Sequence, residues 1–375
     1  MKKLRILHLV QFLGVGGLEK VLFLLIKEQI REGHYVQLIV YDSEETWVEL
    51  FRSEGINVDT TYKKSQGYDK NLLRHLEKFI LSQDIVHTHD LNPLMYAAPL
   101  KALRFLKLKS FPKLIHTAHG MNHLHQRPIT RWYERICSLM TDSTIGVSQG
   151  VCDYYHALGV SKKKIININN GTEVQESPAT DRYVAKYKLA QEFKTDPQKL
   201  FLGAVARIVP LKDQKLLCEA AESFPDFHFF LVGPSGDDAY WTELQRIKPD
   251  NLTMTGGRSD VDEILKGLDW FVSASTHEGI PISVLEAGAQ GTPCLLSDIP
   301  GHKSIQTNAQ KELALFFETG NVDSLILSLK RIQKERELAK ILSLNLFFHV
   351  KEHFSSFKMY QRYLKVYQGQ YDTEA

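Results

Sequence analysis

Short apolar runs alternate with longer segments of mixed polarity along the whole chain. Most runs end near glycine or polar residues and lead into a segment long enough for a helix, which is the pattern of parallel α/β proteins. The predicted strands are residues 5–11, 35–41, 85–88, 113–117, 143–147 and 165–168 in the first half, and 201–206, 228–232, 252–255, 270–274 and 294–297 in the second. The fold class is therefore predicted to be α/β.

Two domains are predicted because the chain has 375 residues, whereas single hydrophobic cores rarely grow beyond about 250–300 residues. The segment 172–199 carries no strand pattern, and its Ser177-Pro178 and Asp196-Pro197 steps interrupt regular structure around one short helix. The domain boundary is expected in this segment. Residues 322–375 are predicted to be helical and include an aromatic-rich stretch, 354–367.

The composition is that of a globular protein, with 43% hydrophobic residues and 23 glycines, which excludes collagen-like and wholly disordered chains. The four cysteines are far apart and form no C-x-x-C motif, so neither a disulfide framework nor a structural zinc site is predicted. They are Cys137, Cys152, Cys218 and Cys294. Reduced thiols indicate a cytoplasmic protein.

A net charge of +2 hides an asymmetry between the two halves. Residues 1–172 hold 23 Lys and Arg against 16 acidic residues, and residues 173–375 hold 23 against 28. A basic first half suits an anionic partner, or is a solvated surface. Arg5, His8 and Gln11 interrupt the apolar start of the chain, which is predicted as a buried strand rather than a signal peptide. Every apolar stretch is shorter than the roughly 20 residues of a membrane-spanning helix, so any membrane contact would be peripheral.

Three glycines, Gly14, Gly16 and Gly17, follow the first predicted strand and lead into an apolar helix. Glycines let backbone amides approach a ligand closely, and a helix N-terminus favours an anion. The spacing is not G-x-G-x-x-G, so a dinucleotide site is only weakly indicated. A tight strand-to-helix turn is the alternative.

Histidines gather at two consecutive predicted strands: His87, His89, His116, His119, His123 and His125. Such a group could ligate zinc, but the second half offers no further cluster of this kind, and no metal site is predicted. His119 is the better catalytic or substrate-positioning candidate, because Gly120 frees the loop to approach a ligand. A plain loop histidine is the alternative.

Two cations, Arg207 and Lys212, follow the first strand of the second half. Arginine forms paired hydrogen bonds with phosphate oxygens and lysine acts as a point charge, so the pair suits a diphosphate. Each charge-assisted hydrogen bond can contribute about 1.5–3 kcal/mol. A solvated turn is the alternative.

The most distinctive pattern places Glu278 in the loop after a strand and Glu286 in the next helix, whose first residue is predicted to be Pro281. A helix start flanked by Gly279 offers free amides to a phosphate or a sugar, and a carboxylate accepts hydrogen bonds from a pair of hydroxyls. An acidic loop with an unrelated helix carboxylate is the alternative.

This run from Glu278 to Glu286 resembles the E-x7-E signature of retaining glycosyltransferases with the GT-B fold, in family 4. Further matches follow in the family's order: Gly16-Gly17-x-Glu19, Asp84-Ile-Val-His87-x-His89, His119-Gly120, Val147-Ser148, Asn170-Gly171, Arg207 with Lys212, Leu231-Val-Gly233 and Gly256. The segment 354–367 resembles the family's last helix. The resemblance thus spans nearly the whole chain.

The resemblance implies two Rossmann-like domains that face each other across a cleft. They are an acceptor-side domain at 1–172 and a nucleotide-sugar-binding domain at 173–353, with a helix at 354–375 packed back on the first domain. The implied activity is retaining, metal-independent transfer of a hexosyl or N-acetylhexosaminyl group. The donor would be a UDP- or GDP-sugar, and the acceptor a saccharide or lipid-linked saccharide of cell-surface polysaccharide or glycolipid synthesis. Neither a cofactor nor a nucleic acid partner is expected.

The same resemblance assigns residues to each role. The catalytic candidates are His119, Arg207, Lys212 and Glu278. The donor-binding candidates are Gly16, Gly17, Arg207, Lys212, Gly256, Arg258, Glu278, Gly279, Ile280, Pro281, Leu285 and Glu286. The acceptor-side candidates are His87, His89 and Ser148.

Two departures from the family pattern stand out. The run Pro300-Gly301-His302-Lys303-Ser304 lacks the acidic residue that often follows Gly-Gly, and Asp213 replaces the usual glycine after the lysine. Two other functions stay open: a nucleotide-sugar epimerase or hydrolase of the same fold, and a catalytically silent sugar-nucleotide-binding protein.

A basic segment adds one more expectation. Residues 100–109 alternate apolar and basic side chains and, with Lys113, carry five positive charges and no negative charge. This is either an ordinary helix whose cations reach solvent, or a basic amphipathic surface that lies on the inner face of an anionic membrane.

Overall fold

The computed structural model describes residues 2–14, 16–42, 46–120, 128–178, 181–279, 281–307 and 309–371. The chain forms two compact units. The first comprises Met1–Gly171 together with Ser356–Ala375, and the second comprises Thr172–Ser355. The sequence-based boundaries, after residues 172 and 353, lie within two residues of these.

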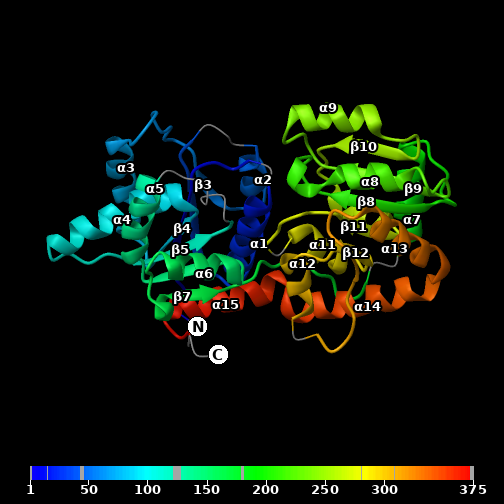
Figure 1. Ribbon diagram of the computed structural model, residues 1–375. Helices are drawn as coiled ribbons and strands as arrows, with labels where there is room; N and C mark the ends of the chain where they lie inside the picture. Colours follow the sequence, from blue (N-terminus) through cyan, green and yellow to red (C-terminus); the bar gives the residue numbers. More distant parts are fainter. Residues whose placement is uncertain are drawn as a thin grey trace. The chain divides into compact units, whose positions relative to one another are not determined.

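The first unit consists of alternating strands and helices (Figure 1). They are β1 (Arg5–Val10), α1 (Gly17–Arg31), β2 (Tyr35–Val40), α2 (Val48–Ser53), β3 (Asn57–Asp59), α3 (Lys70–Ile80), β4 (Ile85–His89), α4 (Leu91–Leu106), β5 (Lys113–Ala118), α5 (Pro128–Leu139), β6 (Ser143–Gly146), α6 (Gln149–Ala157), β7 (Ile165–Asn167) and α15 (Ser356–Gln368). The strands form one parallel sheet in the order β3-β2-β1-β4-β5-β6-β7.

The second unit repeats this plan. Its elements are α7 (Arg182–Glu192), β8 (Leu200–Val205), α8 (Gln214–Ala221), β9 (Phe227–Val232), α9 (Asp238–Ile247), β10 (Leu252–Gly256), α10 (Val261–Gly267), β11 (Trp270–Ser273), α11 (Ile282–Ala289), β12 (Cys294–Ser297), α12 (Pro300–Lys303), β13 (Leu315–Phe317), α13 (Val322–Lys334) and α14 (Arg336–His353). The parallel sheet has the order β10-β9-β8-β11-β12-β13. Both units therefore have the doubly wound Rossmann topology, which confirms the predicted fold class.

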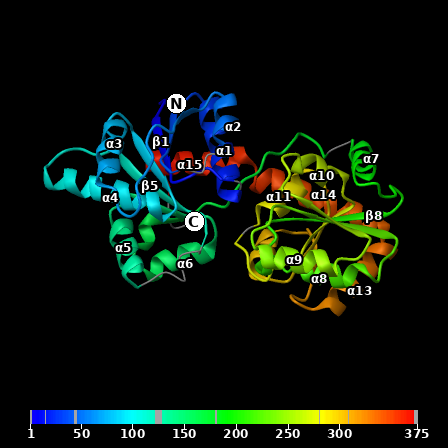
Figure 2. The ribbon, with the colours of Figure 1, turned by 90° about the horizontal axis from the view of Figure 1, so that it is seen from above.

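Each sheet is buried on both faces, as parallel sheets usually are. In the second unit, Figure 2 shows α8, α9 and α13 on one face and α10, α11 and α14 on the other. In the first unit, Leu7 and Leu9 of β1 pack with α3 and α4. His8 between them points to the opposite face, where it contacts Gln29 of α1, because side chains alternate along a strand.

Helix α15 packs on the first unit beside α1 (Figure 2). Polar side chains hold it there: Ser356 Oγ donates to Glu28 Oε1 over 2.8 Å, and Tyr360 OH lies 2.9 Å from His34 Nε2. Tyr363 and Tyr367 are buried against the sheet. The aromatic-rich end of the chain is thus part of the core of the first unit.

Two strands were missed by the sequence pattern. β3 and β13 have three residues each and form the edge of their sheet. Their pairing with β2 and β12 identifies them as strands.

Candidate active site

The strand order of the second sheet reverses at the switch point between β8 and β11. On one side β8 is followed by β9 and β10, and on the other side β11 is followed by β12 and β13. Ligands of such sheets bind beyond the carboxyl ends of the strands at this point. The loop after β8 carries Arg207 and Lys212, and the loop after β11 carries Glu278. The fold therefore brings the loop of Arg207 and Lys212 next to that of Glu278, which lies 66 residues beyond Lys212 in the chain.

The loop after β8 ends in a short 3-10 turn, Pro210–Lys212, followed by Asp213 in the left-handed region with φ 47°. Aspartate tolerates this conformation better than most residues, which explains how it replaces glycine here. Gln214 Nε2 donates to the Arg207 carbonyl over 3.0 Å. The Arg207 side chain is exposed, whereas Lys212 is half-buried.

Lys212 and Glu278 form an ion pair that joins the two loops. Glu278 Oε1 also accepts a hydrogen bond from Ser275 Oγ over 2.9 Å. The backbone supports this contact, because Thr276 N donates to the Leu211 carbonyl over 3.0 Å. The side chains of Lys212 and Glu278 are 21% and 15% exposed, so a ligand can still reach the pair.

The start of α12 lies against the Glu278 loop. A Cβ on Gly301 would lie 2.2 Å from the Gly279 carbonyl oxygen, so only glycine fits at this position. The next residue, His302, is fully buried, and its Nδ1 lies 2.8 Å from the Ser297 carbonyl oxygen. Burial lowers the pKa of His302, with smaller opposing effects from the hydrogen bond to the Ser297 carbonyl and from Glu278. The departure Pro300–Ser304 thus packs its Gly301 against the backbone of Glu278 and Gly279, and its Lys303 pairs with Asp298.

Helix α11 carries Glu286, which is 6% exposed. Pro281 is the N-cap residue of this helix rather than its first residue, and its carbonyl accepts from Val284 N over 3.1 Å. Leu285 is fully buried in the hydrophobic core, so its side chain cannot contact a donor. Ile280 lies outside the described residues.

Gly256 and Arg258 follow β10. Gly256 has φ 74°, and its carbonyl accepts from Gly233 N over 2.9 Å. Arg258 forms ion pairs with Glu192 and with Asp260, the latter over 2.7 Å. These hydrogen bonds raise the pKa of Arg258 above its usual value. Arg258 therefore ties α7 to the loop, and its own charge is already compensated.

In the first unit, the Glu19 side chain contacts the glycine loop that precedes its helix. Glu19, in the first turn of α1, accepts from Gly14 N over 3.1 Å. A Cβ on Gly16 would lie 2.8 Å from the Glu19 carboxylate, and Gly17 is the first residue of α1. Because this carboxylate lies at the positive end of the helix, the loop suits a hydroxyl-bearing ligand better than a second anion.

A cavity of about 340 Å³ opens in the first unit between the glycine loop and the ends of β1 and β4. Gln11, Glu19, His89, Asp90 and Asn92 contribute its polar lining. Asp90 has φ 61° and ψ 178°, a region that only glycine adopts without strain. Its carboxylate accepts from the backbone N of His119 over 2.9 Å. This strained residue holds the His119 loop, and no sequence motif singled it out.

The histidine candidates of the first unit lie mostly inside it. His87 is fully buried, with Nδ1 2.8 Å from Tyr367 OH and Nε2 2.8 Å from Thr117 Oγ1, so it has no exposed atom for an acceptor. His89 is 2% exposed, and His119 is half-buried. Ser148 caps α6 by accepting from Val151 N over 3.4 Å. His123 and His125 lie outside the described residues.

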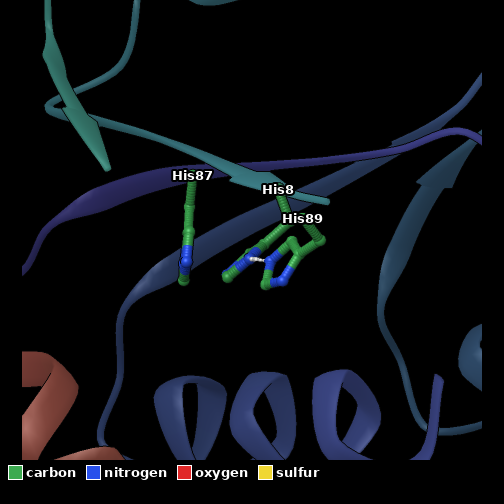
Figure 3. A group of neighbouring side chains, drawn as sticks. All are labelled: His8, His87 and His89. Carbon is green, nitrogen blue, oxygen red and sulfur yellow. Dashed lines mark hydrogen bonds between the residues drawn. The ribbon is translucent and has the colours of Figure 1, made fainter. Parts of the chain in front are cut away.

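His8, His87 and His89 place ring nitrogens within 4.8 Å of one another, although the sequence predicts no metal site. Figure 3 shows His8 and His89 joined by a hydrogen bond, with the His87 ring beside them. All three rings use nitrogens in hydrogen bonds to protein groups. The arrangement is a hydrogen-bonded network of histidines.

All four cysteines are buried and free, and burial raises the pKa of Cys137 to about 12. Across the described ranges, no helix has the length and apolar character needed to cross a bilayer. The basic segment forms the end of α4 and the turn after it, where Phe105 and Leu106 are each 77% exposed.

Two family models match this chain, one in each half. The model of Glycosyltransferase Family 4 matches residues 15–176, and that of Glycosyl transferases group 1 matches residues 186–345. UDP-Gal:alpha-D-GlcNAc-diphosphoundecaprenol alpha-1,3-galactosyltransferase of Escherichia coli is 27% identical, over 70% of this chain and 69% of that protein. The E. coli O-antigen biosynthesis glycosyltransferase WclY is 22% identical, over 92% of this chain and 93% of that protein.

Solved structures match over the full length. HepE of Anabaena in complex with UDP-glucose has a TM-score of 0.83 at 17% identity, and the match covers 98% of this chain and 100% of HepE. The lipopolysaccharide outer core galactosyltransferase WaaB has a TM-score of 0.65 at 18% identity, and the match covers 98% of this chain and 100% of WaaB. The chain belongs to the group 1 glycosyltransferases, and its two Rossmann-like units have the GT-B fold.

Proposed function

We propose that the protein is a retaining, metal-independent glycosyltransferase that takes a UDP- or GDP-sugar as donor. It transfers a hexosyl or N-acetylhexosaminyl group to a saccharide or lipid-linked saccharide for cell-surface polysaccharide or glycolipid synthesis. Two similarities support this: a relative is named for transfer of galactose to a diphosphoundecaprenol-linked sugar, and HepE was solved with UDP-glucose.

The Lys212–Glu278 ion pair at the switch point of the second unit carries the donor proposal. A diphosphate can replace Glu278 as the partner of Lys212, and the exposed Arg207 can bind the same group bidentately. Breaking the anomeric C–O bond builds negative charge on the leaving diphosphate. Fixed cations at this place stabilise the transition state more than the ground state.

Glu278 and Glu286 have different roles in this proposal. Released from Lys212, Glu278 accepts a hydrogen bond from a hydroxyl of the donor sugar, with help from the Gly279–Pro281 backbone. Glu286 binds the ribose hydroxyls, and backbone groups near Gly256 and Arg258 contact the base. In the transfer step the acceptor oxygen bonds to the anomeric carbon on the face that the diphosphate leaves. The leaving phosphate oxygen takes the acceptor proton, so no enzyme nucleophile is needed.

The acceptor is proposed to bind the 340 Å³ cavity of the first unit. Its lining of Gln11, Glu19 and Asn92 offers hydrogen-bond partners to sugar hydroxyls. His119 and Ser148 lie at the carboxyl ends of β5 and β6 in the same sheet. His89 contributes to the wall of the cavity, and His87 supports the sheet beneath it.

The membrane proposal rests on the end of α4. Phe105, Leu106 and Leu108 are 77%, 77% and 97% exposed. Lys107 lies between Leu106 and Leu108 in the sequence, and Lys109 follows Leu108. This surface, the 105–109 patch, suits peripheral binding to anionic lipid, where each cation adds roughly 1 kcal/mol. By contrast, Lys101 is paired with Asp142.

Vesicle co-sedimentation tests the patch. Binding to phosphatidylserine vesicles is expected to fall with salt and to drop when Lys107 and Lys109 become Gln. The Lys162→Gln, Lys163→Gln variant removes two exposed charges elsewhere in the first unit and serves as the control. Equal recovery with phosphatidylcholine and phosphatidylserine vesicles would reject the membrane proposal.

Transfer itself is tested with radiolabelled UDP- and GDP-sugars, with and without polyprenyl-diphosphate-linked GlcNAc. A retaining transferase forms a labelled α-linked product from an α-linked donor only when acceptor is present, and it does so in EDTA. Donor conversion without acceptor indicates the epimerase or hydrolase alternative, and binding without turnover indicates the silent one. Loss of activity in EDTA that Mn²⁺ or Mg²⁺ restores would overturn metal independence.

A further inference from the structure

A continuous chain of hydrogen bonds runs through the first unit from α1 to the end of β5. Gln29 Oε1 lies 2.9 Å from His8 Nε2, and His8 Nδ1 lies 2.9 Å from His89 Nε2. His89 Nδ1 in turn lies 2.9 Å from His119 Nε2. Figure 3 shows the central contact, in which the rings of His8 and His89 lie side by side. Gln29, His8 and His89 are each at most 2% exposed.

The direction of this chain follows from the chemistry of its members. Burial lowers the pKa of His8 to about 4 and also lowers the pKa of His89 and His119. All three rings are therefore neutral at physiological pH, and a neutral imidazole has one N–H donor and one acceptor nitrogen. Fixing the donor at one end of the chain then fixes every ring along it.

Gln29 fixes that end. Its Nε2 donates to Tyr367 OH over 3.1 Å, so its carbonyl oxygen faces His8 and can only accept. His8 Nε2 must then carry the proton, and His8 Nδ1 accepts from His89 Nε2. By the same logic His89 Nδ1 accepts from His119 Nε2. The proton of His119 thus lies on Nε2, and its Nδ1 holds a lone pair.

The free end of the hydrogen-bond chain is a buried acceptor nitrogen. His119 Nδ1 is buried and has no hydrogen-bond partner among the residues that the structure describes. A buried acceptor without a partner is costly, so such atoms call for a missing partner. His119 follows β5 (Lys113–Ala118), at the sheet edge where ligands bind. Asp90, in its strained conformation, anchors the backbone of His119 at this place.

We propose that Gln29, His8 and His89 are positioning residues that hold His119 in the tautomer protonated at Nε2, so that Nδ1 accepts a hydrogen bond from a sugar hydroxyl. The identity of the sugar-bearing ligand rests on the proposed function. The tautomer of His119 and its dependence on Gln29 are independent of the proposed function. Tyr367 of α15 accepts a hydrogen bond from Gln29, so this helix contributes to the orientation of His119 at the ligand-binding edge.

A metal ion on His8, His87 and His89 is the competing use of these side chains. His8 Nδ1 and His89 Nε2 are hydrogen-bonded over 2.9 Å, so one of these two nitrogens carries a proton. Metal ligation instead needs a lone pair on each of them. Both nitrogens of His87 already bond to Tyr367 and Thr117. The contacts therefore favour the hydrogen-bonded chain, and zinc content is measured as part of the test.

The tautomer is read directly from ¹⁵N NMR of protein labelled at histidine, because protonated and lone-pair ring nitrogens differ strongly in chemical shift. The His119 signals are identified by their loss in His119→Gln. Wild-type protein without ligand is expected to show His119 protonated at Nε2 alone. A His119 ring protonated at Nδ1, or zinc bound at one ion per chain and lost in His8→Phe, would overturn the proposal.

Two substitutions of similar size test the control by Gln29. Gln29→Leu removes the acceptor, so His119 is expected to populate both tautomers and kcat/KM to fall roughly two- to tenfold, the effect of one hydrogen bond. Gln29→Glu keeps an acceptor and is expected to keep the wild-type tautomer and rate. His34→Phe, which loses a contact to Tyr360 of the same helix α15, is the control for stability.

These measurements test the positioning role of Gln29 separately from the proposed function. An unchanged His119 tautomer in Gln29→Leu rejects the positioning role, whatever the activity. The expected tautomer in a protein that transfers no sugar leaves the chain intact and rejects the proposed function. If Gln29→Leu does not fold, His89→Phe gives a second break in the chain with the same expected mixture of tautomers at His119.

Discussion

Lys212 and Glu278, separated by 66 residues in the chain, form an ion pair that links the loop after β8 to the loop after β11. Ser275 also holds the Glu278 carboxylate. The pair keeps a cation and a carboxylate together at the switch point before any donor binds. In the proposed mechanism the diphosphate takes over Lys212, which frees Glu278 for the donor sugar.

The role of Lys212 predicts a specific loss. Lys212→Ala is expected to lower kcat by roughly two to three orders of magnitude, as removal of an oxyanion-stabilising donor does, with little change in unfolding free energy. Lys215→Ala removes a nearby lysine that pairs with Glu243 on the surface and is expected to have near-normal activity. Steady-state kinetics of both variants check this. Similar activity in the two variants would remove Lys212 from the site.

Glu286 predicts a different kinetic signature. Ribose contacts are the same in the ground state and the transition state, so their loss raises KM and leaves kcat nearly unchanged. Glu286→Ala is therefore expected to raise the KM for the donor and leave the KM for the acceptor unaffected. Initial rates at varied concentrations of each substrate separate the effects. An unchanged donor KM would contradict the ribose assignment.

The strained backbone at Asp90 is expected to lower stability in exchange for the hydrogen bond that its side chain makes to the His119 backbone. The Asp90 backbone conformation costs on the order of 1–3 kcal/mol in any residue other than glycine. Asp90→Gly and Asp90→Ala both lose the hydrogen bond to His119 N, so both are expected to lower kcat/KM. Only the glycine variant relieves the strain, and urea denaturation is expected to find it more stable than the alanine variant. The reverse order of stability would show that Asp90 is unstrained.

The buried histidines predict an acid-sensitive fold. Burial lowers the pKa of His8 and of His228 to about 4, while unfolded histidine keeps a pKa of about 6.5. Between these values the unfolded chain binds more protons than the folded one, so the unfolding free energy falls as the pH decreases from 6.5 to 4. Each pKa unit corresponds to about 1.4 kcal/mol.

Urea unfolding at pH 7.5, 6.0 and 5.0 measures this slope. His228→Gln, in a different unit from His8, is expected to make the pH dependence shallower by the contribution of one histidine. Stability that is constant from pH 7.5 to pH 5.0 would mean that these rings are already accessible to protons in the folded state.

All strands except β3 and β13, and the two Rossmann-like units, could be predicted from the sequence, because buried parallel strands appear as apolar runs between helical segments. Arg207, Lys212 and Glu278 could be placed together for the same reason, since they follow strands that parallel topology brings to one edge. Leu285 follows Val284 on the core-facing side of α11, so its place among the donor-binding candidates rests on the motif alone.

The remaining features depend on contacts across the fold. The histidine chain needs the register that sets His8 opposite His87 in β1 and β4, and a helix from the far end of the chain that supplies Tyr367. The strain at Asp90 has no signature in residue type. The fold of Glu19 back onto Gly14 could have been suspected from the E in Gly16-Gly17-x-Glu19, but only the observed 3.1 Å contact establishes it.

A thermal-shift screen of UDP-, GDP- and ADP-sugars against wild-type protein, Lys212→Ala and Lys215→Ala tests the donor site most directly. A ligand at 100 times its Kd stabilises the folded protein by about 2.7 kcal/mol. At least one nucleotide-sugar is expected to raise the Tm of the wild type and of Lys215→Ala, and to raise that of Lys212→Ala by a smaller amount, because the bound diphosphate loses one of its two cations. Equal shifts in all three proteins, or no shift with any nucleotide-sugar, would contradict a donor site built on Lys212 and Glu278.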